Sequence, residues 1–233
     1  MADQHLGDEP QGRALRPAYA AELDQLHLQV ELMAMRVDQN LERTRTVLQS
    51  GDLAVADEAI RADDDIDAMS VSLTERCYDL LAREQPVAGD LRFIVSVLRV
   101  LGEFERIGDL ALRVVKLAPD FDLIRSNPST YEILLSMADA AIERYREAMR
   151  AWSGPSAEVA RRLLATPSMA GHLEERLTTE LMALQGSDAA AVAIRTLVAG
   201  KSLERIADHA GIIGARLLFL VTGDAGHLAH EVR

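Results

Sequence analysis

Apolar residues recur every three or four positions along most of the chain, the spacing that places them on one face of an α-helix. Apolar side chains occupy more than one face of residues 88–117, which predicts a helix at the centre of a bundle. The pattern predicts six helices, at residues 19–49, 53–83, 88–117, 129–152, 157–184 (interrupted at Pro167 and Gly171) and 188–221.

Turn residues divide these helices into two sets of three. Pro119 and Pro128 lie at the two ends of a short linker, after which the helical scheme restarts. The connections within each set are short enough to make neighbouring helices antiparallel. We therefore predict an all-α fold of two pseudo-symmetric antiparallel three-helix bundles, at residues 19–118 and 128–224. A disordered lead (residues 1–18) and a polar tail (residues 225–233) are expected to flank them.

One acidic motif occurs twice. Glu105-Arg106-Ile107-Gly108-Asp109-Leu110-Ala111 returns as Glu204-Arg205-Ile206-Ala207-Asp208-His209-Ala210, an offset of 99 residues (204 − 105), with five of seven positions identical. This period is too long for a solenoid repeat and suits a duplicated small domain.

The composition argues against some classes of function and indicates the cellular compartment. Among 233 residues, 25 are basic and 37 acidic, and the net charge of −12 argues against sequence-independent nucleic-acid binding, which requires cations. The single cysteine, Cys77, cannot form an internal disulfide, which favours a reducing compartment and a structural thiol. The sequence contains neither a signal peptide nor an apolar stretch long enough for membrane insertion, so we expect a cytoplasmic protein.

The repeated motif places two carboxylates one helical turn apart. Glu105 and Asp109 share a helix face, as do Glu204 and Asp208. Like charges at this spacing repel by roughly 0.2–0.5 kcal/mol, and a divalent cation between them would reverse the sign. Neutralisation by neighbouring basic residues is the alternative.

A further acidic pair lies on the helix expected to pack beside the first copy of the motif. Asp63 and Asp67 are again four residues apart. On adjacent antiparallel helices, this pair and the pair Glu105 and Asp109 are expected to converge on one or more divalent or iron ions.

Several motifs in the same order resemble the PhoU family. Pro86-Val87-Ala88-Gly89-Asp90-Leu91-Arg92 is similar to the family pattern P-x-A-x-D-L-R, and residues 105–109 to E-R-I-G-D. In the second half, residues 203–210 and 221–223 are similar to L-E-R-I-A-D-H-A and V-T-G. The resemblance extends over residues 19–224.

This resemblance implies a fold, a metal and a set of partners. Members are pairs of three-helix bundles whose E/D-x-x-x-D motifs hold iron or other divalent ions. They are not enzymes. They repress the phosphate-starvation response by linking the ATPase subunit of a phosphate ABC transporter to a sensor histidine kinase, and a homodimer is expected. Metal ligands would be Asp63, Asp67, Glu105 and Asp109, with Glu204 and Asp208 as a weaker second set.

The second half departs from the first. Alignment of Ala56 with Ala160 puts Pro167 opposite Asp63 and Gly171 opposite Asp67, so the acidic pair is missing. Glu174 or His209 are candidate substitutes for the missing carboxylates. A histidine beside the core of a helix is more often structural than a ligand.

Other functions remain open at this stage. A ferritin-like carboxylate metal enzyme would need a Glu-x-x-His pair, and no histidine here has Glu three residues before it. A phosphohydrolase would need a nucleophile with its base or a two-metal centre, and no phosphate-binding glycine-rich loop is found. A structural helical adaptor without metal stays as the third alternative.

Overall fold

The computed structural model describes the backbone of residues 11–231 and the side chains of residues 17–229. No strand occurs in this part of the chain, which confirms the all-α prediction. The elements are α1 (Gln11–Ser50), α2 (Leu53–Glu84), α3 (Ala88–Val115), η1 (Ala118–Asp120), α4 (Phe121–Arg125), α5 (Pro128–Ser153), α6 (Ala157–Ala165), α7 (Met169–Met182), α8 (Ala189–Thr222) and η2 (Ala225–Glu231).

Short polar side chains start the helices where the turn residues predicted. Asp52 caps α2 by accepting a hydrogen bond from the backbone N–H of Ala54 at 2.8 Å. Asn127 caps α5 in the same way, accepting from the N–H of Thr130 at 3.0 Å, with Pro128 as the first helical residue. At the other end of the chain, Gly223 adopts a left-handed φ of 73° and terminates α8.

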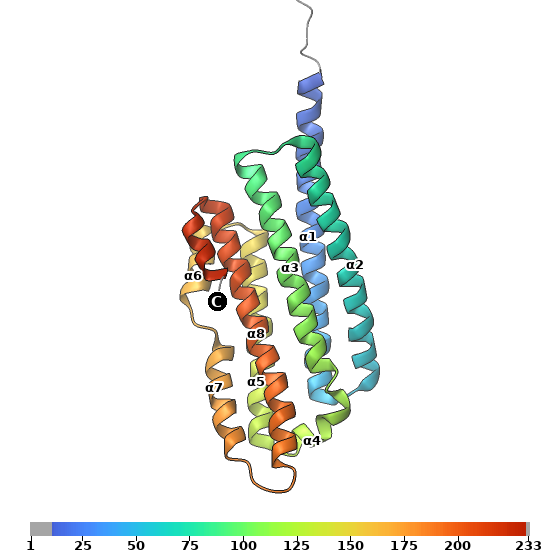
Figure 1. Ribbon diagram of the computed structural model, residues 1–233, viewed down its shortest axis with the longest axis vertical. Coiled ribbons are helices and arrows are strands. Elements are labelled where there is room, and N and C mark those ends of the chain that lie inside the picture. The colour runs from blue at the N-terminus through green and yellow to red at the C-terminus, as the bar shows by residue number, and fades with distance from the viewer. Residues whose placement is uncertain (1–10, 232–233) are drawn as a thin grey trace, which may run out of the picture.

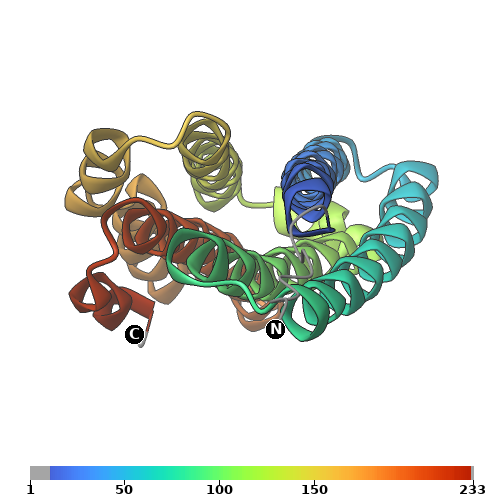
Figure 2. The ribbon, with the colours of Figure 1, turned by 90° about the horizontal axis from the view of Figure 1, so that it is seen from above.

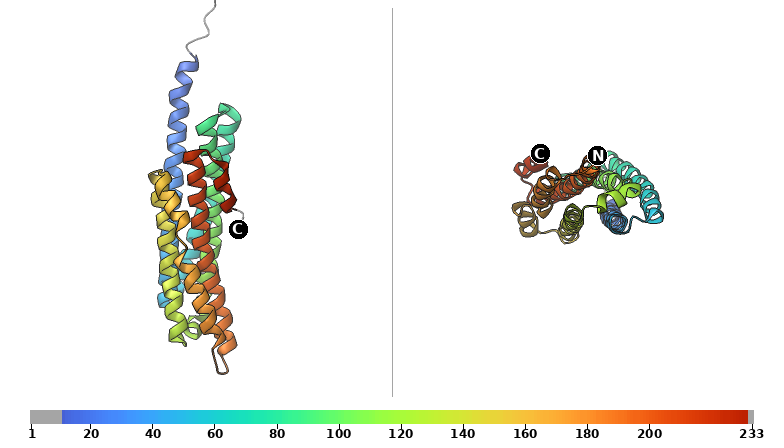
Figure 3. Two further views of the ribbon diagram at one scale, coloured as in Figure 1. Left: turned by 90° about the vertical axis from the view of Figure 1, so that its left-hand side faces the viewer. Right: turned by 90° about the horizontal axis from the view of Figure 1, so that it is seen from below.

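The helices form two units that lie side by side along their length. Helices α1, α2 and α3 make one unit, and α5 packs with α6, α7 and α8 in the other (Figure 1). Seen from above, α3 and α8 lie next to each other at the centre, where the units join (Figure 2). Helices α1 and α5 also meet, and the side view shows one elongated bundle (Figure 3).

One continuous core runs through both units. Its largest fully buried side chains include Phe104 of α3 and Tyr145 of α5, whose rings meet edge to face at 6.2 Å. The Tyr145 hydroxyl donates to the carbonyl of Ala34 in α1 at 2.8 Å, so the polar atom of this buried ring is satisfied. Cys77 is fully buried and its burial raises the pKa of the thiol to about 12, in agreement with a structural role.

Three boundaries differ from the prediction. Helix α1 begins at Gln11 rather than Tyr19, so residues 11–18 are helical, while residues 1–10 of the expected disordered lead lie outside the described residues. The expected polar tail contains η2, which packs against α8. The helix predicted at residues 157–184 is interrupted only at residues 166–168, and Gly171 lies inside α7. Across residues 11–231, no helix is both long and apolar enough to cross a membrane.

Candidate metal centre

The first acidic cluster consists of Asp63 and Asp67 on α2 with Glu105 and Asp109 on α3. Asp63 is 5% exposed, whereas the other three side chains are exposed. The buried carboxylate lies directly against the backbone of α3, because a Cβ added to Gly108 would come within 2.5 Å of Asp63 Oδ1. Glycine in the middle of the motif therefore makes room for a carboxylate from the neighbouring helix.

The pKa values of Asp63 and Asp67 respond to the nearby carboxylates of both helices. Burial, followed by repulsion from Asp67 and Asp109, raises the pKa of Asp63 from 3.8 to about 6, against a weaker opposing effect of Lys116. Burial, followed by repulsion from Glu105 and Asp109, also raises the pKa of Asp67. The cluster therefore concentrates negative charge between α2 and α3.

The donor atoms of this cluster suit a hard cation. Carboxylate oxygens are the ligands preferred by Mg²⁺, Ca²⁺ and Mn²⁺, and a bound cation would favour the charged form of each group. As the side chains stand, no three His, Cys, Asp or Glu residues in the described part of the chain form a group that could hold a metal ion. Coordination would thus require rotation of the exposed side chains Asp67, Glu105 and Asp109 toward Asp63.

The second cluster has a different register from the one expected. A Cβ added to Gly200 would touch Leu177, and one added to Gly214 would touch Leu163. Both contacts give the same register of α6 and α7 against the antiparallel helix α8. In this register Ala170 lies opposite Ala207, which corresponds to Gly108 in the 99-residue repeat.

In this register, Ala170 takes the place of Asp63, and Glu174 takes the place of Asp67. The expected equivalents, Pro167 and Gly171, are wrong by three positions (170 − 167). This offset is already present in α6, because Leu163 before the connector and Leu177 after it share one register with α8. The second unit therefore keeps one of the two carboxylates on the partner helix.

A lysine that the sequence analysis missed lies within the second cluster. Lys201 Nζ is 2.9 Å from Glu174 Oε1 and 3.0 Å from Glu204 Oε2, so it joins α7 to α8. Burial alone would raise the pKa of Glu174, but hydrogen bonds from Lys201 and Thr178 lower it. Hydrogen bonds to Glu174 and Glu204 raise the pKa of Lys201. A signal was available in the sequence, because Lys201 stands where the first unit has Gly102.

Asp208 shares a helix face with Glu204 but has a different environment. Burial, followed by repulsion from Glu204, raises the pKa of Asp208, with weaker opposing effects of His209, Arg205 and Lys201. Of the six predicted ligands, the structure thus groups four in the first unit and leaves Glu204 and Asp208 in the second.

His209 joins the two units. Its Nδ1 lies 2.7 Å from Glu103 Oε2 on α3, and Glu103 also accepts a hydrogen bond from Arg106 at 2.9 Å. The side chain of Glu103 is buried, with 2% exposed. His209 is therefore a structural residue of the α3–α8 interface, as the more common role of such a histidine indicated, and it does not replace a missing carboxylate of the second cluster.

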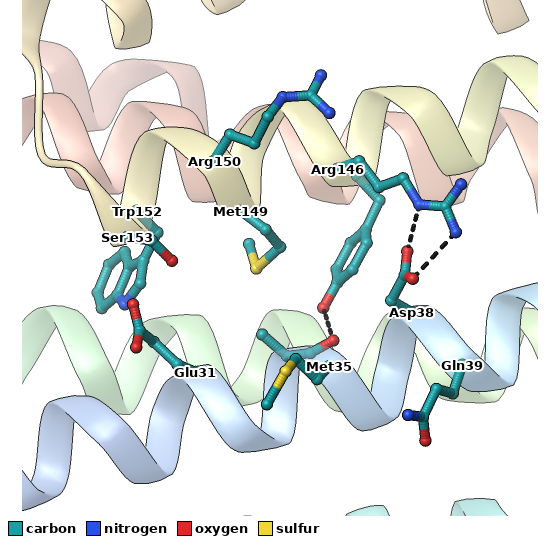
Figure 4. A pocket seen from close by; sticks show the side chains of 11 residues that line it. Glu31, Met35, Asp38, Gln39, Arg146, Met149, Arg150, Trp152 and Ser153 are labelled. Atoms are coloured by element: carbon teal, nitrogen blue, oxygen red, sulfur yellow. Dashed lines mark hydrogen bonds and ion pairs between the residues drawn. The ribbon is translucent and has the colours of Figure 1, made fainter.

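A separate groove lies between α1 and α5, where the units also meet. It encloses about 660 Å³ and is lined by Met35, Met149 and Trp152 among others. Figure 4 shows Arg146 facing Asp38 across this groove, with hydrogen bonds of 2.7 and 3.0 Å. Arg146 also pairs with Glu42 at 2.7 Å, so two carboxylates of α1 neutralise its charge within the fold.

Comparison with known proteins agrees with the duplicated architecture. The PhoU domain model matches residues 30–118 and 134–217, one segment in each unit. The chain belongs to the PhoU family. The resemblance noted in the sequence is thereby confirmed.

Similar PhoU proteins cover nearly the whole chain. The phosphate-specific transport system accessory protein PhoU homolog 2 of Mycobacterium tuberculosis is 29% identical over 210 residues, covering 90% of this chain and 99% of its own. The Escherichia coli accessory protein PhoU is 26% identical over 207 residues, covering 88% and 86%.

Solved PhoU structures have the same fold. The crystal structure of PhoU from Pseudomonas aeruginosa superposes with a TM-score of 0.82 at 27% identity, covering 88% of this chain and 100% of that one. The regulatory protein PhoU from Streptococcus pneumoniae superposes with a TM-score of 0.69 at 22% identity, covering 88% and 98%.

Proposed function

We propose that this chain is a regulatory accessory protein of a phosphate-specific transport system. The observation that carries this proposal is the match of the PhoU domain model to both units. Relatives that cover nearly all of the chain are named accessory proteins of such a system. The chain acts in the cytoplasm as a dimer and represses the phosphate-starvation response while phosphate is ample.

Regulation of this kind works through binding rather than catalysis. The expected partners are the ATPase subunit of a phosphate ABC transporter and a sensor histidine kinase. A chain that contacts both can convey the state of the transporter to the kinase. The test is deletion of the gene, followed by measurement of phosphate-starvation promoters in phosphate-rich medium. We expect derepression that the wild-type gene reverses, and unchanged promoter activity would refute the repressor role.

The first acidic cluster is proposed to bind a divalent or iron ion. The support is the grouping of Asp63, Asp67, Glu105 and Asp109 between two helices and the raised pKa values of the two α2 carboxylates. A bound cation would supply the positive charge that the cluster lacks and would hold α2 against α3. The regulatory state of the protein would then depend on metal as well as on its partners.

Metal analysis separates this proposal from a metal-free structural adaptor. Protein purified without chelator is analysed for Fe, Mn, Zn and Mg, and its melting temperature is measured with each ion added. We expect bound metal and a higher melting temperature, both lost in Asp63→Asn/Glu105→Gln. Asp65→Asn, an exposed change on the same helix, is the control. No metal and no shift with any ion would reject the metal site.

Catalysis is the remaining alternative. Turnover of phosphate esters is measured with the metal-loaded protein and with Glu105→Ala. We expect no turnover above background in either sample. Reproducible activity that Glu105→Ala abolishes would overturn the assignment to a binding protein.

A further inference from the structure

We infer that the ammonium group of Lys201 takes the place of a metal ion in the second acidic cluster, so that this chain binds metal through its first unit alone. The inference rests on the proposed metal role of the first cluster. It assigns to the second unit a cation that is part of the chain itself.

The geometry of Lys201 is that of a bridging cation. Its Nζ contacts one carboxylate on α7 at 2.9 Å and one on α8 at 3.0 Å, both within hydrogen-bonding distance. These carboxylates, Glu174 and Glu204, occupy the places that Asp67 and Glu105 hold in the first unit. The ammonium group thus joins the same two positions that a metal ion is proposed to join in the first cluster.

The second cluster also lacks the buried carboxylate of the first. Ala170 is fully buried where the first unit has Asp63, so this position supplies no oxygen ligand, and Glu174 is the buried carboxylate of the second cluster. Lys201 then offsets part of the charge of the remaining three carboxylates, Glu174, Glu204 and Asp208. A divalent ion would have to displace the ammonium group and would find fewer ligands than in the first unit.

The first unit has an open position where the second has its lysine. Gly102 corresponds to Lys201 in the repeat, and a Cβ added there meets no atom within 4 Å. A lysine at residue 102 would precede Glu105 by three residues, as Lys201 precedes Glu204. Substitutions at these two positions should therefore decide whether each cluster holds a lysine ammonium group or a metal ion.

The test uses Mn²⁺ as the probe and full-length protein in which the first cluster is removed by Asp63→Asn, Asp67→Asn, Glu105→Gln and Asp109→Asn. With Lys201 present, we expect no Mn²⁺ in the dialysed protein and no change in melting temperature. Adding Lys201→Met should allow Mn²⁺ to raise the melting temperature by about 5–10 °C at 100 times the Kd, an effect removed by Glu204→Gln. Arg176→Met, which removes a charge from the exposed side of α7, is the control and should give no response.

The reverse exchange is made in the otherwise unchanged protein. Gly102→Lys should abolish the Mn²⁺ response of the first cluster, whereas Gly102→Ala, which adds only a methyl group, should keep it. If Lys201→Met does not fold, Lys201→Gln serves in its place.

Each result has one meaning. Mn²⁺ binding that needs Glu204 while Lys201 is present would overturn the inference, as would folded Lys201 variants that never respond to Mn²⁺. If the unchanged first cluster ignores Mn²⁺, Fe²⁺ and Zn²⁺ while Lys201→Met creates a response in the second, the proposed metal site fails and the role of Lys201 stands.

Discussion

Asp63→Asn should stabilise the metal-free protein at pH 7.5, although it removes a buried charged group. In the folded chain the pKa of Asp63 is about 6, compared with 3.8 for an ordinary aspartate. The folded state therefore holds a proton on this group more tightly than the unfolded state does. Stability from this group is fully present below pH 3.8 and is lost as the pH rises through 6.

The size of the effect follows from the two pKa values. One pKa unit corresponds to about 1.36 kcal/mol, so the ionised carboxylate destabilises the fold by up to about 3 kcal/mol at pH 7.5. An asparagine keeps the shape without the charge, and we expect a gain of roughly 1–3 kcal/mol. The linkage relation predicts that the difference between variant and wild type decreases by about 1.4 kcal/mol between pH 7.5 and pH 5.

Urea unfolding with EDTA present, at pH 7.5 and pH 5, measures both quantities. Asp65→Asn removes the same charge from an exposed position of α2 and should change stability by less than about 0.5 kcal/mol. Equal effects of the two substitutions would show that net charge, rather than burial between α2 and α3, determines the result. A loss of stability in Asp63→Asn at pH 7.5 would refute the reasoning.

Three further predictions concern the packing between helices. Gly214→Ala should destabilise the protein by about 1 kcal/mol in thermal unfolding, because its methyl group would meet a leucine of α6. Gly211→Ala has open space around it and should stabilise the protein by up to about 1 kcal/mol. The same effect at both sites would contradict the α6–α8 register. His209→Ala should lower the unfolding free energy by about 1–3 kcal/mol, since Glu103 loses a buried partner, and adding Glu103→Gln should recover part of the loss in a double-mutant cycle. Tyr145→Phe should lower it by about 1–2 kcal/mol in urea unfolding, because a buried carbonyl of α1 loses its donor, and an unchanged midpoint would show that this hydrogen bond adds nothing.

Helical periodicity and turn residues were sufficient to predict the fold. Asp52 and Gly223 mark ends of α2 and α8 by caps whose chemistry is local, so they can be read directly from the sequence. The start of α1 was missed because residues 11–18 carry no apolar stripe and include Gly12 and Pro17, which disfavour a helix interior, although they continue the helix. The local sequence therefore did not indicate where the helix begins.

The two acidic clusters differ in how far sequence could predict them. In the first unit, the i, i+4 spacing fixes which carboxylates share a face, and uninterrupted antiparallel helices bring Asp63 and Asp109 together. In the second unit, the register against α8 depends on side-chain packing, with Leu163 of α6 against Gly214 and Leu177 of α7 against Gly200, which spacing alone does not provide. The pairing of Lys201 with Glu174 follows from that register and was therefore missed.

The extensive contact between α3 and α8 has a consequence for how the molecule melts. The units share one hydrophobic core, and the buried contact between Glu103 and His209 spans their boundary. Separation of the units would break this contact and would expose apolar surface to water. Neither unit is therefore expected to persist as an independent foldon. A single cooperative transition follows, and a cation bound by the first cluster would raise the melting temperature of the entire chain.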